Sequence, residues 1–121
     1  MKKLFFVLFA FLSINFAIGQ AKSGVSNHVF LMCDQSETPL MMYGQAFYIV
    51  LHNNGKVQMI CGKDLSSAIS NGPTKSGTWS ASGSNVWWTW SDGKRSEDWK
   101  FNSYSNNLST GSSVLKDMGK F

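Results

Sequence analysis

The chain has 121 residues and a formal net charge of +4, with 11 basic and 7 acidic side chains. This length can bury one compact core and predicts a single domain. Lys2 and Lys3 belong to a predicted leader, and without them the chain has nine basic and 7 acidic side chains. Lys94 and Arg95 form a pair at a turn rather than a basic patch, so the composition argues against a nucleic-acid partner.

Residues 1–21 have the order of a cleaved secretory signal peptide, namely a basic start, an apolar run and small residues. The apolar run, residues 4–18, is shorter than the roughly 20 residues of a membrane span. Cleavage fits after Gly19 or after Ala21, and an uncleaved N-terminal anchor is the alternative. We expect an exported protein, periplasmic or extracellular, with no stable membrane insertion after cleavage and one domain over residues 22–121.

Short alternating segments separated by turn residues dominate the rest of the chain. They predict an all-β fold, a small antiparallel meander that closes into a barrel or a sandwich. Residues 64–69 could form one helical turn with Asp64 as its N-cap. The predicted strands are His28–Cys33, Ala46–His52, Lys56–Cys61, Thr78–Ser82, Val86–Ser91, Glu97–Ser103, Leu108–Thr110 and Ser113–Met118.

The register of the hairpin over residues 46–61 can be argued from its loop. A three-residue loop, Asn53–Gly55, with Gly55 in the left-handed conformation, separates apolar from polar residues on the two faces. A two-residue loop would mix them. The preferred register puts Phe47, Ile49 and Leu51 beside Val57, Met59 and Cys61.

Aromatic residues gather on one face of the next three strands. A two-residue turn at Gly83-Ser84 pairs Trp79 with Trp88. A four-residue loop over Asp92–Arg95 would then pair Trp88 with Trp99, whereas a two-residue loop would shift the register and keep the same faces. The shared face holds Trp79, Trp88, Trp90, Trp99 and Phe101.

Two cysteines, Cys33 and Cys61, predict a disulfide in an exported protein. In a simple meander, however, another strand separates them, and strands two places apart are too distant for that bond. Either the first strand pairs out of sequence, or Cys33 lies in the loop beyond its strand, or the two thiols are free. With nearby methionines they would offer soft ligands for Cu(I), although methionine usually fills a core. We expect no metal site and no cofactor.

No nucleophile elbow, zinc motif or phosphate loop is present in the sequence. Glu97 and Asp98 are adjacent, so on a strand they would face opposite sides and could not act as a pair. We therefore expect no enzyme activity. A hydrolase would need a histidine within reach of a serine or a carboxylate in the folded chain.

Residues 77–93 resemble the repeating hairpins of small bacterial lipocalin-like domains. The likeness consists of Gly77-Thr78-Trp79, a Ser-Gly-Ser-Asn turn, alternating apolar residues and Asp92-Gly93. The lipocalin Gly-x-Trp signature normally lies near the mature N-terminus, whereas here it lies in the middle of the chain. The resemblance implies an antiparallel barrel that binds a small hydrophobic molecule, and it carries over no particular residue.

Two binding hypotheses follow. The first is a non-catalytic protein that binds a small apolar or aromatic ligand against the wall Phe47, Ile49, Trp79, Trp88, Trp90 and Trp99. The second is a surface module that binds a glycan or a protein through Trp87, which points away from that wall. The alternative to both is that the aromatic residues only pack a core.

Overall fold

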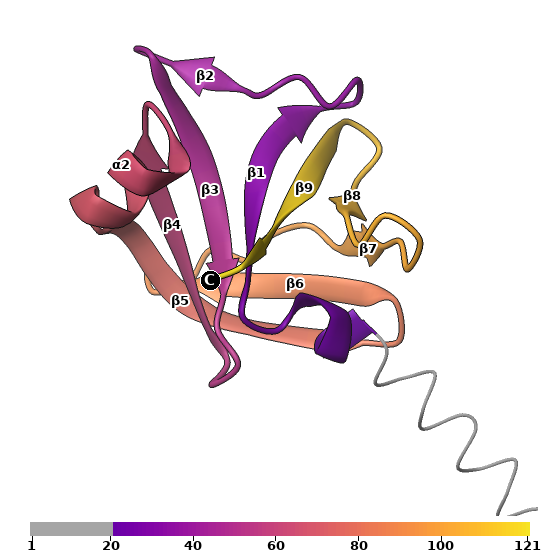
Figure 1. Ribbon diagram of the computed structural model, residues 1–121. Helices are drawn as coiled ribbons and strands as arrows, with labels where there is room; N and C mark the ends of the chain where they lie inside the picture. The colour runs from indigo at the N-terminus through magenta and orange to yellow at the C-terminus, as the bar shows by residue number, and fades with distance from the viewer. Residues whose placement is uncertain (1–20) are drawn as a thin grey trace, which may run out of the picture.

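The computed structural model describes residues 21–121, which form a closed antiparallel β-barrel (Figure 1). The strand order is β1-β9-β8-β7-β6-β5-β4-β3-β2, and pairing of β1 with β3 closes a ring of eight strands that leaves β2 outside. The predicted all-β class is confirmed, as a barrel. The strands are β1 His28–Asp34, β2 Met41–Met42, β3 Gln45–Leu51, β4 Lys56–Gly62, β5 Pro73–Ser82, β6 Asn85–Trp90, β7 Trp99–Phe101, β8 Leu108–Ser109 and β9 Ser113–Lys120.

The predicted register of the β3–β4 hairpin is confirmed. Leu51 pairs with Val57, and the same register continues along both strands. Gly55 has a φ of 86°, the left-handed conformation that the three-residue loop requires. The sequence missed the two-residue strand β2, which pairs with the start of β3.

The β5–β6 hairpin also has its predicted register, with Trp79 opposite Trp88. The predicted register of a four-residue loop between β6 and β7 is wrong, because Val86 rather than Trp88 pairs with Trp99. This is the register of the shorter loop, and it leaves every aromatic residue on its predicted face. An isolated bridge between Thr89 and Arg95 interrupts that register near the turn.

An inner core fills the barrel. It takes apolar residues from every strand of the ring, together with two from the segment before β1. Burial of this apolar area is the main stabilising contribution to the fold. Its fully buried members include Val25, Phe30, Ile49, Leu51, Val57, Val86, Leu108 and Leu115.

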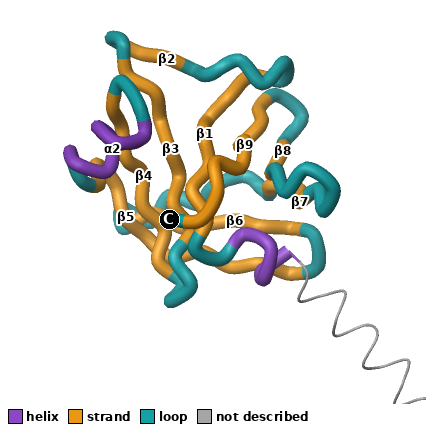
Figure 2. Tube along the Cα trace, viewed as in Figure 1, coloured by secondary structure: helices purple, strands orange, loops and turns teal. Residues whose placement is uncertain are grey.

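A second cluster packs on the outer face of β1, β3 and β4, around the helix α2 (Leu65–Asn71). Asp64 caps this helix by accepting a hydrogen bond from the backbone N–H of Ser67 at 2.8 Å, as the sequence predicted. Gly62 lets the helix approach, because a Cβ there would lie 2.5 Å from the backbone nitrogen of Ala68. Figure 2 shows α2 beside β3 and β4.

Residues 21–25, called here the N-terminal turn, form a short helix that the sequence did not predict. Ala21 and Val25 are fully buried in the inner core. In Figure 1 this turn lies at the end of the barrel opposite β2. It closes that end, and the predicted signal peptide lies outside the described residues except for Ala21.

The predicted disulfide is wrong, since Cys33 and Cys61 are free thiols. Strand β3 lies between β1 and β4, as the meander argument anticipated. The two side chains also face opposite ways. Cys33 belongs to the outer cluster, whereas Cys61 pairs with Phe47 on the face of β3 that points into the barrel.

Candidate functional site: the open mouth of the barrel

The end of the barrel away from the N-terminal turn contains a cavity of about 260 Å³, called here the mouth. Its wall is largely apolar, with three indoles and two thioethers, and polar groups join it from β5 and the segment after β6. The lining residues are Met32, Met59, Lys75, Trp88, Trp90, Ser96, Glu97 and Trp99. A mostly apolar cavity with a few polar groups is the usual form of a small-molecule site.

Trp88 contacts both of the other indoles of the mouth. Trp88 stacks on Trp99, with ring centroids 5.8 Å apart and an angle of 14° between the planes. Trp90, two residues along the same strand face, meets Trp88 edge-on at 6.2 Å. The stack arises because Trp99 pairs with Val86 and so lies diagonally across from Trp88. Two of the three rings are thus nearly parallel, and the third stands at 67° to Trp88.

Trp99 carries a buried donor that has no partner among the described residues. The residue is 3% exposed, and its indole Nε1 has no hydrogen-bond partner among the described residues. Trp79 contrasts with it, because its Nε1 donates to the carbonyl of His52 at 2.7 Å. A buried donor without a partner costs about 1–3 kcal/mol.

Two side chains of opposite charge, Lys75 and Glu97, also line the mouth. The Lys75 ammonium lies 5.5 Å from the centroid of the Trp90 ring, within cation–π range. Ser96 holds the segment next to Glu97 against β6. Its Oγ accepts from the backbone N–H of Trp88 at 2.9 Å, and its own N–H donates to the Trp88 carbonyl at 2.7 Å. The segment that carries Glu97 is therefore anchored to the strand of Trp88 and Trp90.

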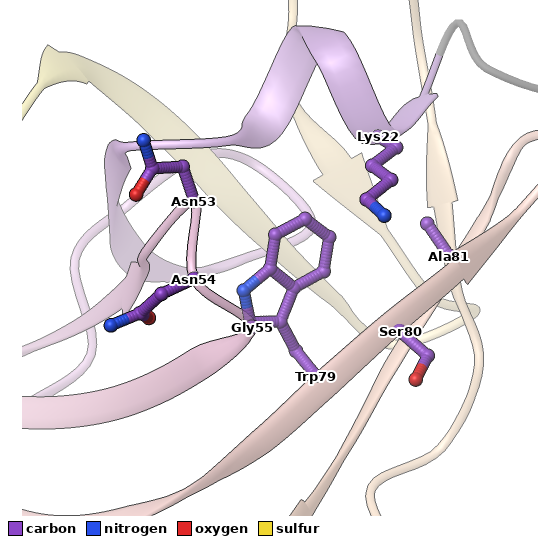
Figure 3. A pocket seen from close by; sticks show the side chains of 7 residues that line it. All are labelled: Lys22, Asn53, Asn54, Gly55, Trp79, Ser80 and Ala81. Atoms are coloured by element: carbon purple, nitrogen blue, oxygen red, sulfur yellow. The ribbon is translucent and has the colours of Figure 1, made fainter.

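A different cavity, of about 390 Å³, lies beside the N-terminal turn (Figure 3). Trp79 forms its apolar wall, Lys22 lies beside the ring, and the amides of Asn53 and Asn54 come from the β3–β4 loop (Figure 3). The Asn54 Oδ1 already accepts from the backbone N–H of Lys56. This cavity is polar, and it exposes little of the indole, since Trp79 is 6% exposed.

The residues of the predicted ligand wall lie in different parts of the barrel. Trp88, Trp90 and Trp99 lie together at the mouth. Trp79 lines the cavity at the other end, Ile49 is buried in the inner core, and Phe47 is half-buried outside the mouth.

Trp87 points outward, as predicted, and is half-buried opposite Ser80. The Arg95 guanidinium lies over its ring at 5.3 Å, so one face of the indole already has a partner.

The sequence missed five residues of the mouth. Met59 could have been included, because the predicted hairpin register puts it on the apolar face of β4. Lys75 could not, because β5 was expected to begin at Thr78 and begins at Pro73. The other three are Met32, Ser96 and Glu97, which join the site only through the closure of the barrel and the path of one loop.

A histidine does come within reach of a carboxylate. His28 Nδ1 lies 2.9 Å from Asp117 Oδ1, and Asn106 Nδ2 donates to the other oxygen at 2.8 Å. Burial raises the pKa of Asp117, but the hydrogen bonds from His28, the Gly119 N–H and Asn106 outweigh it, so the pKa is lowered. The pair lies on β1 and β9, away from the residues that line the mouth.

Within residues 21–121, no group of three or more His, Cys, Asp or Glu side chains is arranged to hold a metal ion. The same part of the chain contains no helix long and apolar enough to cross a membrane. Comparison with known proteins found no matching family model, no matching curated protein and no matching solved structure. The described residues therefore form a small β-barrel in which three indoles line the mouth.

Proposed function

We propose that this chain is an exported, non-catalytic binding protein that takes one small, flat, apolar molecule into the mouth. The observation that carries the proposal is the cavity of about 260 Å³ whose wall includes three touching indoles and two methionines. Ligand cavities commonly span about 300–1,000 Å³, so this one suits a molecule of one or two rings. The lipocalin-like resemblance implies the same class of ligand.

The polar groups of the mouth indicate which chemical groups a ligand should carry. Lys75 stands at the rim beside the Trp90 ring. A planar aromatic molecule with a carboxylate would pair with the Lys75 ammonium, while the indoles and thioethers contact its ring. The His28–Asp117 pair does not line the mouth, which favours binding over hydrolysis there.

The test is a titration of tryptophan fluorescence with a panel of fatty acids, flavins and naphthyl dyes, some with and some without a carboxylate. We expect saturable quenching by at least one planar aromatic member. Trp90→Ala should weaken that binding about tenfold, which corresponds to roughly 1.4 kcal/mol. Trp87→Ala is the matched control on the same strand, and it should leave the affinity unchanged because this ring faces outward.

Two outcomes would count against the proposal. Unchanged fluorescence across the whole panel would mean that the indoles only pack the barrel. Loss of binding in Trp87→Ala but not in Trp90→Ala would favour the surface module for a glycan or a protein. Iodide would then quench Trp87 first in the free protein.

A further inference from the structure

Lys75 is a charged residue on the inner face of the barrel wall. It precedes Gly77 and Trp79 by two and four residues on β5, and residues two apart on a strand share a face. Trp79 belongs to the inner core, so Lys75 lies on the inward face of β5, at the end where this strand reaches the mouth. Its neighbour on β4 is Met59, which also lines the mouth. The apolar wall of the mouth therefore carries one positive charge.

Glu97 brings a negative charge to the same cavity. Two residues further along the chain, Trp99 begins β7 and stacks on Trp88. The Ser96 hydroxyl donates to the backbone carbonyl of Glu97 at 2.9 Å, and its oxygen accepts from the backbone N–H of Trp88 at 2.9 Å. The backbone of Glu97 is therefore held beside the aromatic strand, and Glu97 lines the mouth from a fixed position.

Neither of these charges has a partner of opposite sign in the part of the chain that the structure describes. Two ion pairs occur among residues 21–121, one between β1 and β9 and one within residues 95–98, and neither includes Lys75 or Glu97. The two side chains therefore line one cavity without pairing with each other. Such an arrangement is complementary to a molecule that carries both a negative and a positive group.

We propose that the ligand of the mouth is a zwitterionic aromatic molecule of the aromatic amino acid class. Its ring contacts the indoles and the two thioethers, its carboxylate pairs with Lys75, and its ammonium pairs with Glu97. The cavity of about 260 Å³ limits this ligand to one or two rings. The inference rests on the proposed function, because it names the ligand class of the same site, and it adds a role for Glu97 in recognition.

The first experiment compares three ligands with the same phenyl ring by isothermal titration calorimetry of the purified protein. Phenylalanine carries both charges, 3-phenylpropionate carries only the carboxylate, and 2-phenylethylamine carries only the ammonium. We expect phenylalanine to bind about fivefold more tightly than either analogue, because each analogue lacks one ion pair at the rim. Equally tight binding of 3-phenylpropionate would overturn the role of Glu97, and equally tight binding of 2-phenylethylamine would overturn that of Lys75.

A second experiment assigns each ligand charge to its residue. Glu97→Gln keeps the shape of the side chain and should weaken phenylalanine binding about fivefold, while the affinity for 3-phenylpropionate does not fall. Lys75→Met keeps an apolar stem and should weaken the binding of phenylalanine and 3-phenylpropionate, but not that of 2-phenylethylamine. The matched controls are Asp98→Asn and Lys100→Met, which remove exposed charges near Glu97 that do not line the mouth. They should change none of the three affinities.

Failure of the zwitterionic ligand differs measurably from failure of the proposed function. If a naphthyl dye of the fluorescence panel binds at the mouth while the three phenyl ligands bind equally tightly or not at all, the proposed function stands and the zwitterionic ligand is overturned. Equal effects of Glu97→Gln and Asp98→Asn on phenylalanine binding would overturn it as well. If neither the phenyl ligands nor any member of the panel binds, both are overturned.

Discussion

The two ends of the barrel differ in how their apolar side chains are covered. At one end the N-terminal turn buries Ala21 and Val25 in the inner core, and the backbone N–H of Phe121 donates to the carbonyl of Asn27. At the other end Met32 and Trp90 remain only partly buried around a cavity. Alternating apolar residues can therefore fill the middle of a small barrel, while its ends need separate cover. Apolar surface that stays uncovered is available to a ligand.

The largest expected difference between the two ends is the loss of unfolding free energy when a core side chain is truncated. Leu51 near the closed end is fully buried, whereas Met59, which faces the same interior from the partner strand, is only partly buried at the mouth. We expect Leu51→Ala to cost about 2–5 kcal/mol of unfolding free energy, and Met59→Ala only about 1 kcal/mol. Urea unfolding with comparable m-values would measure both. Equal losses would mean that the mouth is packed as tightly as the closed end.

Gly77 lies opposite Trp90 on β5, and a Cβ there would collide with the backbone carbonyl of Thr89. Gly77→Ala must therefore push β5 and β6 apart at the mouth, at a cost of about 1–3 kcal/mol. It should also change the tryptophan emission and weaken ligand binding. Gly111→Ala is the control, because nothing lies within 4 Å of its Cβ position. If both variants kept wild-type stability, the close approach of the two strands would not matter.

The His28–Asp117 pair joins β1 to β9 and should give the fold a pH dependence. Because folding lowers the pKa of Asp117, its stabilising effect is present above the ordinary carboxyl pKa and is lost as the pH falls through the lowered value. Asp117→Asn should cost about 1–2 kcal/mol at neutral pH, a difference that disappears in acid. Asp98→Asn, which removes only the exposed ion pair with Arg95, should change little. A constant difference at every pH would rule out titration of Asp117 as the cause.

The last prediction concerns how fast the two thiols react with an alkylating reagent. Cys33 is fully buried and burial raises its pKa, so it should react very slowly with an alkylating reagent in the folded protein. Cys61 is 8% exposed and should also be protected. Both should react at once in denaturant without a reducing agent. An intact mass lighter by two hydrogens, with no thiol to alkylate, would restore the disulfide and contradict the placement of β3 between these strands.

Local patterns were enough to predict most of the barrel wall. Alternation located seven of the eight ring strands within a few residues, and β5 was located over its second half. Gly55 and the Asn53–Gly55 loop determined one register through backbone conformation alone. The faces of the tryptophans were also predictable, because a register shift of two residues leaves each side chain on its own side of the sheet.

Only the tertiary structure decided which of these residues meet. Trp79 and Trp88 share a face and a pairing, yet Trp79 lines the cavity at the closed end while Trp88 lines the mouth. The N-terminal turn carried too short an apolar pattern to be recognised beside the apolar run of the leader. Sequence therefore determined the strands and their faces, which depend on neighbours along the chain. The closed end, the mouth and the free cysteines depend on contacts between distant segments, which form only when β1 closes the ring.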